Sequence, residues 1–257
     1  AGQVPKPTLP TPPAPLSTTI RQPTSWQISS FSGWHQSHEA AYRHPADDEA
    51  SALPITGERD PYAGADFGNA LHTVLEHIRP EDWRPCSTQA IAQCTQALLQ
   101  FGYPLKMAEI GSSNLAGLVQ ACLLARLPEG LSLADIPDSD KRHEMEFHLR
   151  LRHASSSRVL KLLQRFGYCQ QRTQLGFQSA LNGLLTGKID LLYRHAGKIH
   201  IVDYKSNSLA AYDDAALQSS IRDHEYDLQY LLYTVAVQRW LRLRMPVYDY
   251  RRHFGGV

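Results

Sequence analysis

The sequence predicts an α/β protein in which helices flank a mixed central sheet. Three observations lead to this fold class. Apolar residues recur at helical spacing in the first half of the chain. A stretch of strict apolar–polar alternation follows, and after it come two strand-like stretches joined by a short turn. Two further helical stretches follow the strands, where they can cover one face of the sheet.

The first half of the chain predicts a linker followed by helices. Seven of the sixteen prolines lie in residues 1–25, so this segment is expected to be a semi-extended tether to domains upstream. The folded domain is then expected to span residues 26–257. Turn-forming residues predict a loop at Ala46–Ala65. The spacing of apolar residues predicts three helices, at Asp66–Arg79, Thr88–Phe101 and Asn114–Leu127.

The second half predicts the sheet. Met145, Phe147 and Leu149 alternate with polar residues, which is typical of a strand with one polar face. A tight turn at Ala196-Gly197 indicates a β-hairpin. The predicted strands are His143–Leu151, Leu185–Arg194, Lys198–Lys205 and Val247–Phe254, and the predicted helices are Ser157–Phe166, Asp213–Ile221 and Glu225–Leu243.

Composition excludes several classes of protein. No apolar run approaches the roughly 20 residues that span a bilayer, and no signal segment begins the sequence, so a cytoplasmic protein with no membrane partner is expected. The four cysteines are scattered and form no C-x-x-C pair, which argues against zinc and iron–sulfur sites. We expect them to be reduced and mostly buried thiols.

Charge is unevenly distributed although the net charge is only +1. Residues 39–82 hold ten acidic and three basic residues, whereas residues 141–172 hold eight basic and two acidic ones. Five arginines and one aspartate lie in residues 239–252. Such a distribution suits a protein that meets phosphate groups on its basic side, and ordinary solvated helix faces are an equally good interpretation.

Three residues of the predicted hairpin point to phosphodiester chemistry. Asp203 and Lys205 share one face of their strand, and Asp190 lies on the partner strand, where the hairpin can bring it beside Asp203. Two carboxylates can hold Mg²⁺, and a lysine can orient a water molecule or stabilise a leaving oxygen. The alternative is a cross-strand salt bridge with only a structural role.

Further candidates flank the hairpin in sequence. His72 lies at the edge of a helical apolar stripe, where a histidine usually has a structural role, and it can also reach a metal held by Asp190 and Asp203. Glu144 and Glu146 share a polar strand face, and one of them could contribute a carboxylate. Gln229 and Tyr233 are four residues apart on one helix face, which is a weak signal on its own.

Taken together, these residues resemble the nuclease domains of RecB-type subunits of the bacterial RecBCD helicase–nucleases, also called exonuclease V. The matching segments, in chain order, are Gly68-x-x-x-His72-x-x-Leu75-Glu76, Glu144-Met145-Glu146-Phe147, Gly187-Lys188-Ile189-Asp190-Leu191, Asp203-Tyr204-Lys205-Ser206-Asn207, Tyr226-Asp227-Leu228-Gln229-Tyr230-x-x-Tyr233 and His253-Phe254-Gly255-Gly256-Val257. The resemblance covers the chain from about residue 26 to its end, and the final strand that is usual beyond Val257 is absent.

The resemblance implies a restriction-endonuclease-like PD-(D/E)xK core and a DNA nuclease that uses Mg²⁺, with Ca²⁺ or Mn²⁺ as substitutes. It implies metal ligation by His72, Asp190, Asp203 and the backbone carbonyl of Tyr204, with Asp190, Asp203 and Lys205 catalytic. Glu144, Gln229 and Tyr233 would be accessory or substrate-binding residues.

The same resemblance implies a set of partners. These are single- and double-stranded DNA, RecC- and RecD-like subunits, the helicase part of RecB, and the RecA recombinase. Two other hypotheses remain: a protein-docking module for recombinase loading with an inactive nuclease site, and a free-standing restriction or junction endonuclease on the same core. The intact Asp190, Asp203 and Lys205 count against the first of these, and the proline-rich opening counts against the second.

Overall fold

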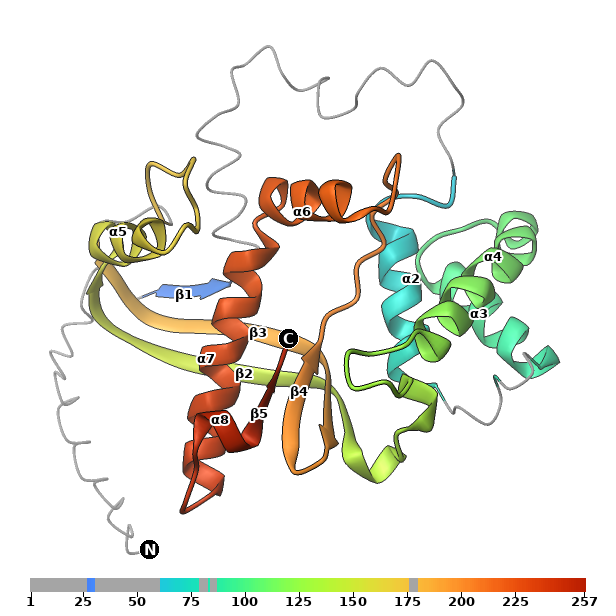
Figure 1. Ribbon diagram of the computed structural model, residues 1–257. Helices are drawn as coiled ribbons and strands as arrows, with labels where there is room; N and C mark the ends of the chain where they lie inside the picture. The colour runs from blue at the N-terminus through green and yellow to red at the C-terminus, as the bar shows by residue number, and fades with distance from the viewer. Residues whose placement is uncertain (1–26, 31–60, 79–82, 84–86, 176–179) are drawn as a thin grey trace, which may run out of the picture.

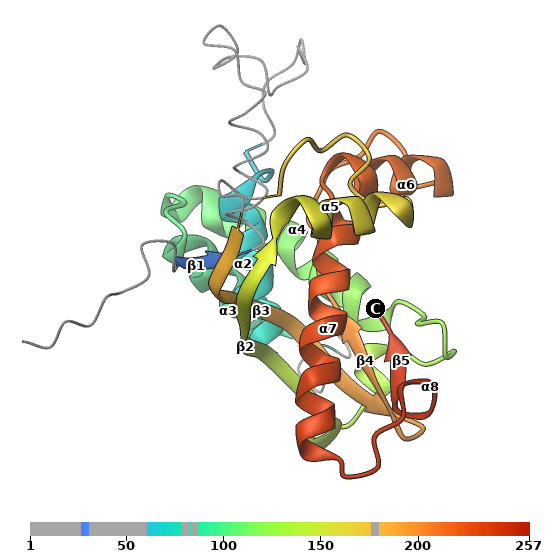
Figure 2. The same cartoon turned by 90° about the vertical axis from the view of Figure 1, so that its left-hand side faces the viewer.

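A computed structural model of the chain describes residues 27–30, 61–78, 83, 87–175 and 180–257. Within these residues five strands form one mixed sheet with helices on both faces, as Figures 1 and 2 show, so the predicted fold class is confirmed. The predicted linker and most of the loop predicted at Ala46–Ala65 lie outside the described residues. The boundaries of the domain therefore stay predictions.

The sheet is organised around β3 (Ala180–His195), which pairs with three other strands. β2 (Lys141–Ser155) runs antiparallel along one edge of β3. The other edge pairs with β1 (Gln27–Ser30) in parallel and with β4 (Lys198–Val202) in antiparallel orientation. β5 (Phe254–Gly256) lies parallel to β4 at the end of the sheet.

The edge of β3 that pairs with both β1 and β4 has an unpaired stretch between these two strands, and this stretch matters for the site. β1 pairs with residues 183–186, and β4 pairs with residues 191–195. Among the described residues, no strand pairs with residues 187–190 on that edge. Asp190 therefore lies where the paired edge of the sheet is interrupted, and groups from other elements can approach it there.

The two faces of the sheet have separate hydrophobic cores. One core joins the sheet to α2 (Ala65–Glu76), α3 (Thr88–Gln100) and α4 (Leu105–Leu124), with fully buried Leu98 and Leu115 among its members. The other core lies beneath α5 (Ser156–Arg165) and α7 (Tyr226–Arg244) and includes Phe147, Ile189, Leu228 and Val237. Because α2 belongs to the first core and α7 to the second, side chains from both layers can meet only at the edge of the sheet.

α4 is longer than the sequence predicts. The apolar spacing indicated a helix from Asn114, whereas α4 begins nine residues earlier, at Leu105. The buried face of this first part consists of small residues, Ala108, Gly111 and Ser112. These residues pack closely against their neighbours but carry no hydrophobic signal, so the spacing of large apolar residues missed them.

The other predicted helices are confirmed within three residues at each end. α5 (Ser156–Arg165) begins after Ser155, whose side chain accepts a hydrogen bond from the backbone of the first turn. α6 (Asp214–Asp223) is capped by Asp213 in the same way. α7 (Tyr226–Arg244) follows directly and crosses the sheet in Figure 1. Short 3₁₀ helices η2 (Leu133–Asp135) and η3 (Asp138–Asp140) connect α4 to β2.

The predicted final strand Val247–Phe254 is wrong. Asp249 accepts a hydrogen bond from the backbone N–H of Arg252 and so caps a short helix, α8 (Tyr250–His253). The last strand is β5, which begins only at Phe254. The aromatic and β-branched residues of this segment are typical of strands, whereas the local capping bond decides the backbone conformation.

The cysteines agree with the sequence prediction where the structure describes them. Cys94, Cys122 and Cys169 are reduced thiols, and two of the three are buried. Burial raises the pKa of Cys169 to about 12, so its thiol is inert at neutral pH. None of the helices in the described part of the chain is both long and apolar enough to cross a membrane.

The packing of Phe147 on Gly187 gives a prediction about stability. These residues face each other across β2 and β3, and a Cβ at residue 187 would lie 2.5 Å from the Phe147 ring. Gly187→Ala should therefore lower the free energy of unfolding by roughly 1–3 kcal/mol, because the buried ring must move. Urea denaturation followed by circular dichroism measures this change.

Gly117→Ala is the matched control, since residue 117 is exposed within α4 and a Cβ there would meet nothing within 4 Å. It should raise the free energy of unfolding by about 0.5–1 kcal/mol through helix propensity. Equal effects of the two substitutions would show that the contact between Phe147 and Gly187 is not tight.

Candidate active site

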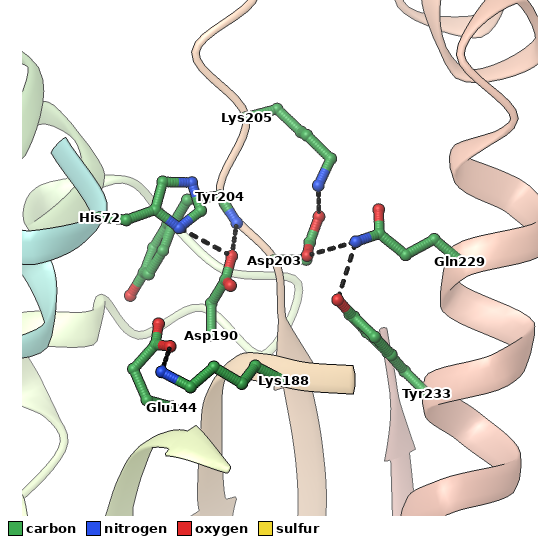
Figure 3. Close-up of polar contacts among 9 residues, drawn as sticks. All are labelled: His72, Glu144, Lys188, Asp190, Asp203, Tyr204, Lys205, Gln229 and Tyr233. Carbon is green, nitrogen blue, oxygen red and sulfur yellow. Dashed lines mark hydrogen bonds and ion pairs between the residues drawn. The ribbon is translucent and has the colours of Figure 1, made fainter. Parts of the chain in front are cut away.

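A polar cavity of about 930 Å³ opens between α2 and α7, above the interrupted edge of β3. Its walls are formed by α2, β2, β3, the segment that follows β4, and the start of α7. Figure 3 shows the side chains that converge there. The cavity is lined by seven of the eight predicted site residues, namely His72, Glu144, Asp190, Asp203, Tyr204, Lys205 and Gln229, and Tyr233 lies directly behind Gln229.

The carboxylate of Asp190 determines where β4 ends. The sequence predicted a strand as far as Lys205, but the last ladder pair joins Leu191 to Val202, and β4 stops there. Two residues beyond Val202, the backbone N–H of Tyr204 donates to Asp190 Oδ2 at 2.8 Å. The carboxylate of Asp190 thus takes the place of the β3 backbone carbonyl that would accept this hydrogen bond if the two strands stayed paired. Residues 203–205 turn toward the cavity instead.

His72 approaches the same carboxylate from α2. Its Nδ1 lies 3.5 Å from Asp190 Oδ2, and its ring packs edge-on against Tyr204. Burial lowers the pKa of His72, but the hydrogen bond to Asp190 and the negative charges of Asp190 and Asp203 outweigh it. The pKa of His72 is therefore raised above its ordinary value of 6.5, and the imidazole attracts a proton more strongly than a free histidine.

Glu144 reaches the cavity because the backbone of β2 is irregular at this residue. Glu144 has a φ of 49°, a left-handed conformation that is uncommon for a residue with a side chain. One oxygen each of Glu144 and Asp190 and one ring nitrogen of His72 all lie within 4.8 Å of one another. Two carboxylates and an imidazole at this spacing form a donor set that fits a divalent cation.

Asp203 is the second aspartate that lines the cavity. Its carboxylate accepts from Lys205 Nζ, and from Gln229 Nε2 at 3.3 Å. Gln229 Nε2 also donates to the hydroxyl of Tyr233, at 2.8 Å. Burial and the nearby charge of Asp190 raise the pKa of Asp203, and the ammonium of Lys205 only partly offsets this rise. The two aspartates therefore repel each other, and a bound cation would relieve that repulsion.

Two other glutamates near the site differ in position. Glu76 is exposed and lines the outer part of the cavity, one turn after His72 on α2. Glu146 is exposed on β2 and is not among the residues that line the cavity. Of the two glutamates that share the predicted polar face, only Glu144 therefore reaches the cavity.

Two cavity residues were missed as site candidates, although both lie within the matching segments. Lys188 is half exposed on β3, and its Nζ pairs with Glu144 Oε2 at 2.9 Å. Tyr226 begins α7, and its ring lies 4.6 Å from Lys205 Nζ. Neither could be selected from spacing, since a lysine two residues before an aspartate and a tyrosine at a helix start are both common.

The two basic segments of the sequence, residues 141–172 and 239–252, contribute only part of their charged side chains to the exposed surface. Arg158, Lys161 and Arg165 lie exposed along α5, as do the arginines at the end of α7 and on α8. Arg172 is different, because it is 2% exposed and bonds to Glu225 at the start of α7. The inclusion of Arg172 in a phosphate-facing surface was therefore wrong, and its charge stabilises the fold instead.

Comparison with known proteins identifies the superfamily. A profile described as the PD-(D/E)XK nuclease superfamily matches residues 30–248. The chain is 39% identical over 247 residues to the RecBCD enzyme subunit RecB of Escherichia coli, covering 91% of this chain and 20% of that protein. For the RecB subunit of Haemophilus influenzae the identity is 31%, over 90% of this chain and 21% of the relative.

The subunit of Mycolicibacterium smegmatis is 29% identical over 97% of the chain and 27% of its own length. The chain thus spans about a fifth to a quarter of these relatives. The mixed sheet, the acidic cavity at its interrupted edge and the sequence match agree, and this chain belongs to the PD-(D/E)XK nuclease superfamily.

Proposed function

We propose that this chain is a DNA nuclease domain that hydrolyses phosphodiester bonds with a divalent metal, of which Mg²⁺ is the expected ion and Mn²⁺ or Ca²⁺ substitutes. The observation that carries the proposal is the convergence of His72, Glu144 and Asp190 in the cavity that also holds Asp203 and Lys205. Membership of a nuclease superfamily gives this donor set its chemical context.

The side chains of His72, Glu144, Asp190 and Asp203 are proposed to hold the metal, together with the backbone carbonyl of Tyr204. Carboxylate and carbonyl oxygens are the ligands that Mg²⁺ prefers, and the imidazole adds a neutral donor once it loses its proton. When bound, the metal would lower the pKa of a water molecule and neutralise charge on the phosphate.

Lys205 is proposed to act on the substrate directly. Its ammonium is a point charge that can orient the attacking water or stabilise the leaving oxygen. Gln229 is proposed to orient Asp203 through the hydrogen bond at 3.3 Å, and Tyr233 to hold Gln229 in that orientation. Both helix residues thus act as supports for the carboxylate rather than as reacting groups.

The relatives suggest the setting in which the domain works. They are named as subunits of the RecBCD enzyme, and this chain matches only part of their length. We propose that it serves as the nuclease part of a RecBCD-type helicase–nuclease, cutting unwound DNA strands both exo- and endonucleolytically during double-strand break repair in the cytoplasm. RecC- and RecD-like subunits, the helicase part of RecB, and RecA are the proposed partners.

A direct test incubates the purified chain with end-labelled single-stranded DNA in Mg²⁺ or in EDTA. Cleavage in Mg²⁺ that is lost in EDTA supports the proposal. Binding of RecA without any cleavage would favour a docking module instead. Sequence-specific cutting of intact duplex DNA would favour a free-standing endonuclease.

Asp203→Asn separates the catalytic role of the carboxylate from its effect on stability. Cleavage should be abolished, because metal binding loses a charge. The folded pKa of Asp203 is raised, so its ionised form disfavours folding as the pH rises above about 4. The metal-free variant should therefore be at least as stable as the wild type between pH 6 and 8, as measured by thermal denaturation in EDTA.

Glu146→Gln serves as the control, since it removes an exposed carboxylate from the neighbouring strand. It should leave both cleavage and the melting temperature close to the wild-type values. Wild-type cleavage by Asp203→Asn would remove Asp203 from the site.

His72→Ala tests the proposed imidazole ligand. Only the neutral ring can bind a metal, and the raised pKa of His72 means that protons compete with the metal above pH 6.5 as well as below it. Metal affinity of the wild type should thus fall between pH 8 and pH 6, and the variant should bind more weakly with a flatter pH dependence. Calorimetry with Mn²⁺ at both pH values measures this.

The control is His77→Ala, because His77 lies exposed near the end of the same helix and outside the catalytic cavity. If His72→Ala keeps the wild-type affinity and pH profile while losing stability, the role of His72 is structural.

Lys205→Ala should separate metal binding from chemistry. Metal affinity should be unchanged or slightly higher, because a nearby positive charge is removed. The rate of cleavage should fall by roughly 10²-fold or more, as for loss of one electrostatic stabiliser. Lys198→Ala, at the start of β4, is the matched control. Cleavage at the wild-type rate by Lys205→Ala would make this lysine structural.

A further inference from the structure

The side chain of Lys205 is not positioned by regular secondary structure. Residues 203–213 form neither helix nor strand, and Lys205 lies just beyond the end of β4. A lysine in such a segment has many rotamers, and restricting them costs roughly 2 kcal/mol. Among the described residues, two contacts restrict this one: the carboxylate of Asp203 and the ring of Tyr226, whose centroid lies 4.6 Å from Nζ.

Tyr226 is itself held from two sides. Its hydroxyl donates to Asn207 Oδ1 at 2.8 Å, and its ring stacks on that of His224 with centroids 5.2 Å apart and planes at 12°. His224 Nε2 in turn lies 3.4 Å from Asn207 Nδ2. Asn207 is only two residues beyond Lys205, so the same network also restrains the segment that carries the lysine.

A buried ion pair fixes the start of the helix that carries Tyr226. Glu225 precedes Tyr226, and its backbone has a left-handed φ of 52°. The Glu225 carboxylate accepts from Arg172 Nε at 2.6 Å and also from Arg172 Nη2. Both residues are buried, so this bidentate pair is shielded from water and can maintain the unusual backbone conformation. The ring of Tyr226 therefore has a defined place relative to the cavity.

We propose that Tyr226 is the positioning residue for Lys205, holding the ammonium over its ring so that the lysine can face the scissile phosphate. The inference rests on the proposed nuclease function. An aromatic face attracts a cation without accepting a conventional hydrogen bond. The N–H groups of Lys205 therefore stay available for the substrate, whereas Asp203 alone would draw the lysine onto a proposed metal ligand.

Tyr226→Leu, which removes the ring, should lower kcat by about 3- to 30-fold, the range expected for one cation–π contact. KM for DNA and the affinity for Mn²⁺ should stay within about twofold of the wild type. Tyr226→Phe keeps the ring and loses only the hydrogen bond to Asn207, so it should retain most of kcat. Tyr230→Leu is the matched control, because Tyr230 lies one turn later on α7 and contacts Tyr168 instead.

A double-mutant cycle shows whether Tyr226 acts through the lysine. In the Lys205→Ala background, Tyr226→Leu should cause no further loss in single-turnover rate. A merely structural role would lower the rate in both backgrounds. A fall in kcat with Tyr226→Phe as large as that with Tyr226→Leu would also overturn the proposal, since the hydroxyl rather than the ring would then be responsible.

A spectroscopic measurement needs no catalysis. The ε-methylene protons of Lys205 should resonate upfield in the wild type because of the ring current of Tyr226, with their assignment taken from the signal lost in Lys205→Arg. The upfield shift should persist in Tyr226→Phe and disappear in Tyr226→Leu. Ordinary lysine shifts in the wild type would overturn the positioning role even if DNA is cleaved. If neither the wild type nor any variant cleaves DNA in Mg²⁺ or Mn²⁺, the proposed function itself fails.

Discussion

The hydrogen bond from the backbone N–H of Tyr204 to the carboxylate of Asp190 is the contact on which the site depends. It ends the pairing of β3 with β4 and joins the two acidic segments at one point. The same carboxylate faces His72 on α2, so a single side chain connects the sheet, the segment after β4 and the first helical layer. Without this bond a continued ladder would fill the edge where the cavity opens.

The site combines several features that are unfavourable for folding in isolation. Asp190 and Asp203 repel each other, Glu144 adopts a left-handed backbone conformation, and Asp203 is largely removed from solvent. Each feature costs free energy, which the two hydrophobic cores on either side of the sheet must offset. The repulsion between the two aspartates also supports the proposed cation site, because a bound cation would remove it.

Two layers of the fold contribute to the cavity in different ways. α2 supplies His72, the proposed imidazole ligand, whereas α7 supplies side chains that contact other site residues: Gln229 contacts Asp203, and Tyr226 contacts Lys205. Glu225 directly precedes the cavity residue Tyr226, and its buried ion pair with Arg172, 53 residues earlier in the chain, holds the start of α7. Composition alone would assign the charge of Arg172 to a phosphate-binding surface. In the fold it instead stabilises the start of the helix that carries Tyr226, the proposed positioning residue for Lys205.

The sequence by itself determined the architecture and most of the cavity residues. Periodicity of 3.6 and 2 residues located the helices and strands, because burial of one face imposes those repeats wherever large apolar side chains are used. It failed at the start of α4, where the buried face is made of small residues, and at Val247–Phe254, where a single capping bond outweighs strand propensity. His72, Asp190, Asp203, Lys205 and Gln229 could be named from the order of their motifs.

Only the tertiary structure decided how these residues meet. No local pattern indicates that β4 stops at Val202, since the competing acceptor, Asp190, lies on another strand. Glu144 rather than Glu146 enters the cavity because of one unusual backbone angle, and alternation along an ideal strand cannot distinguish the two. The roles of Arg172 and Tyr226 depend on partners far away in the sequence or on the fold of the intervening loop, and such contacts exist only once the chain has folded.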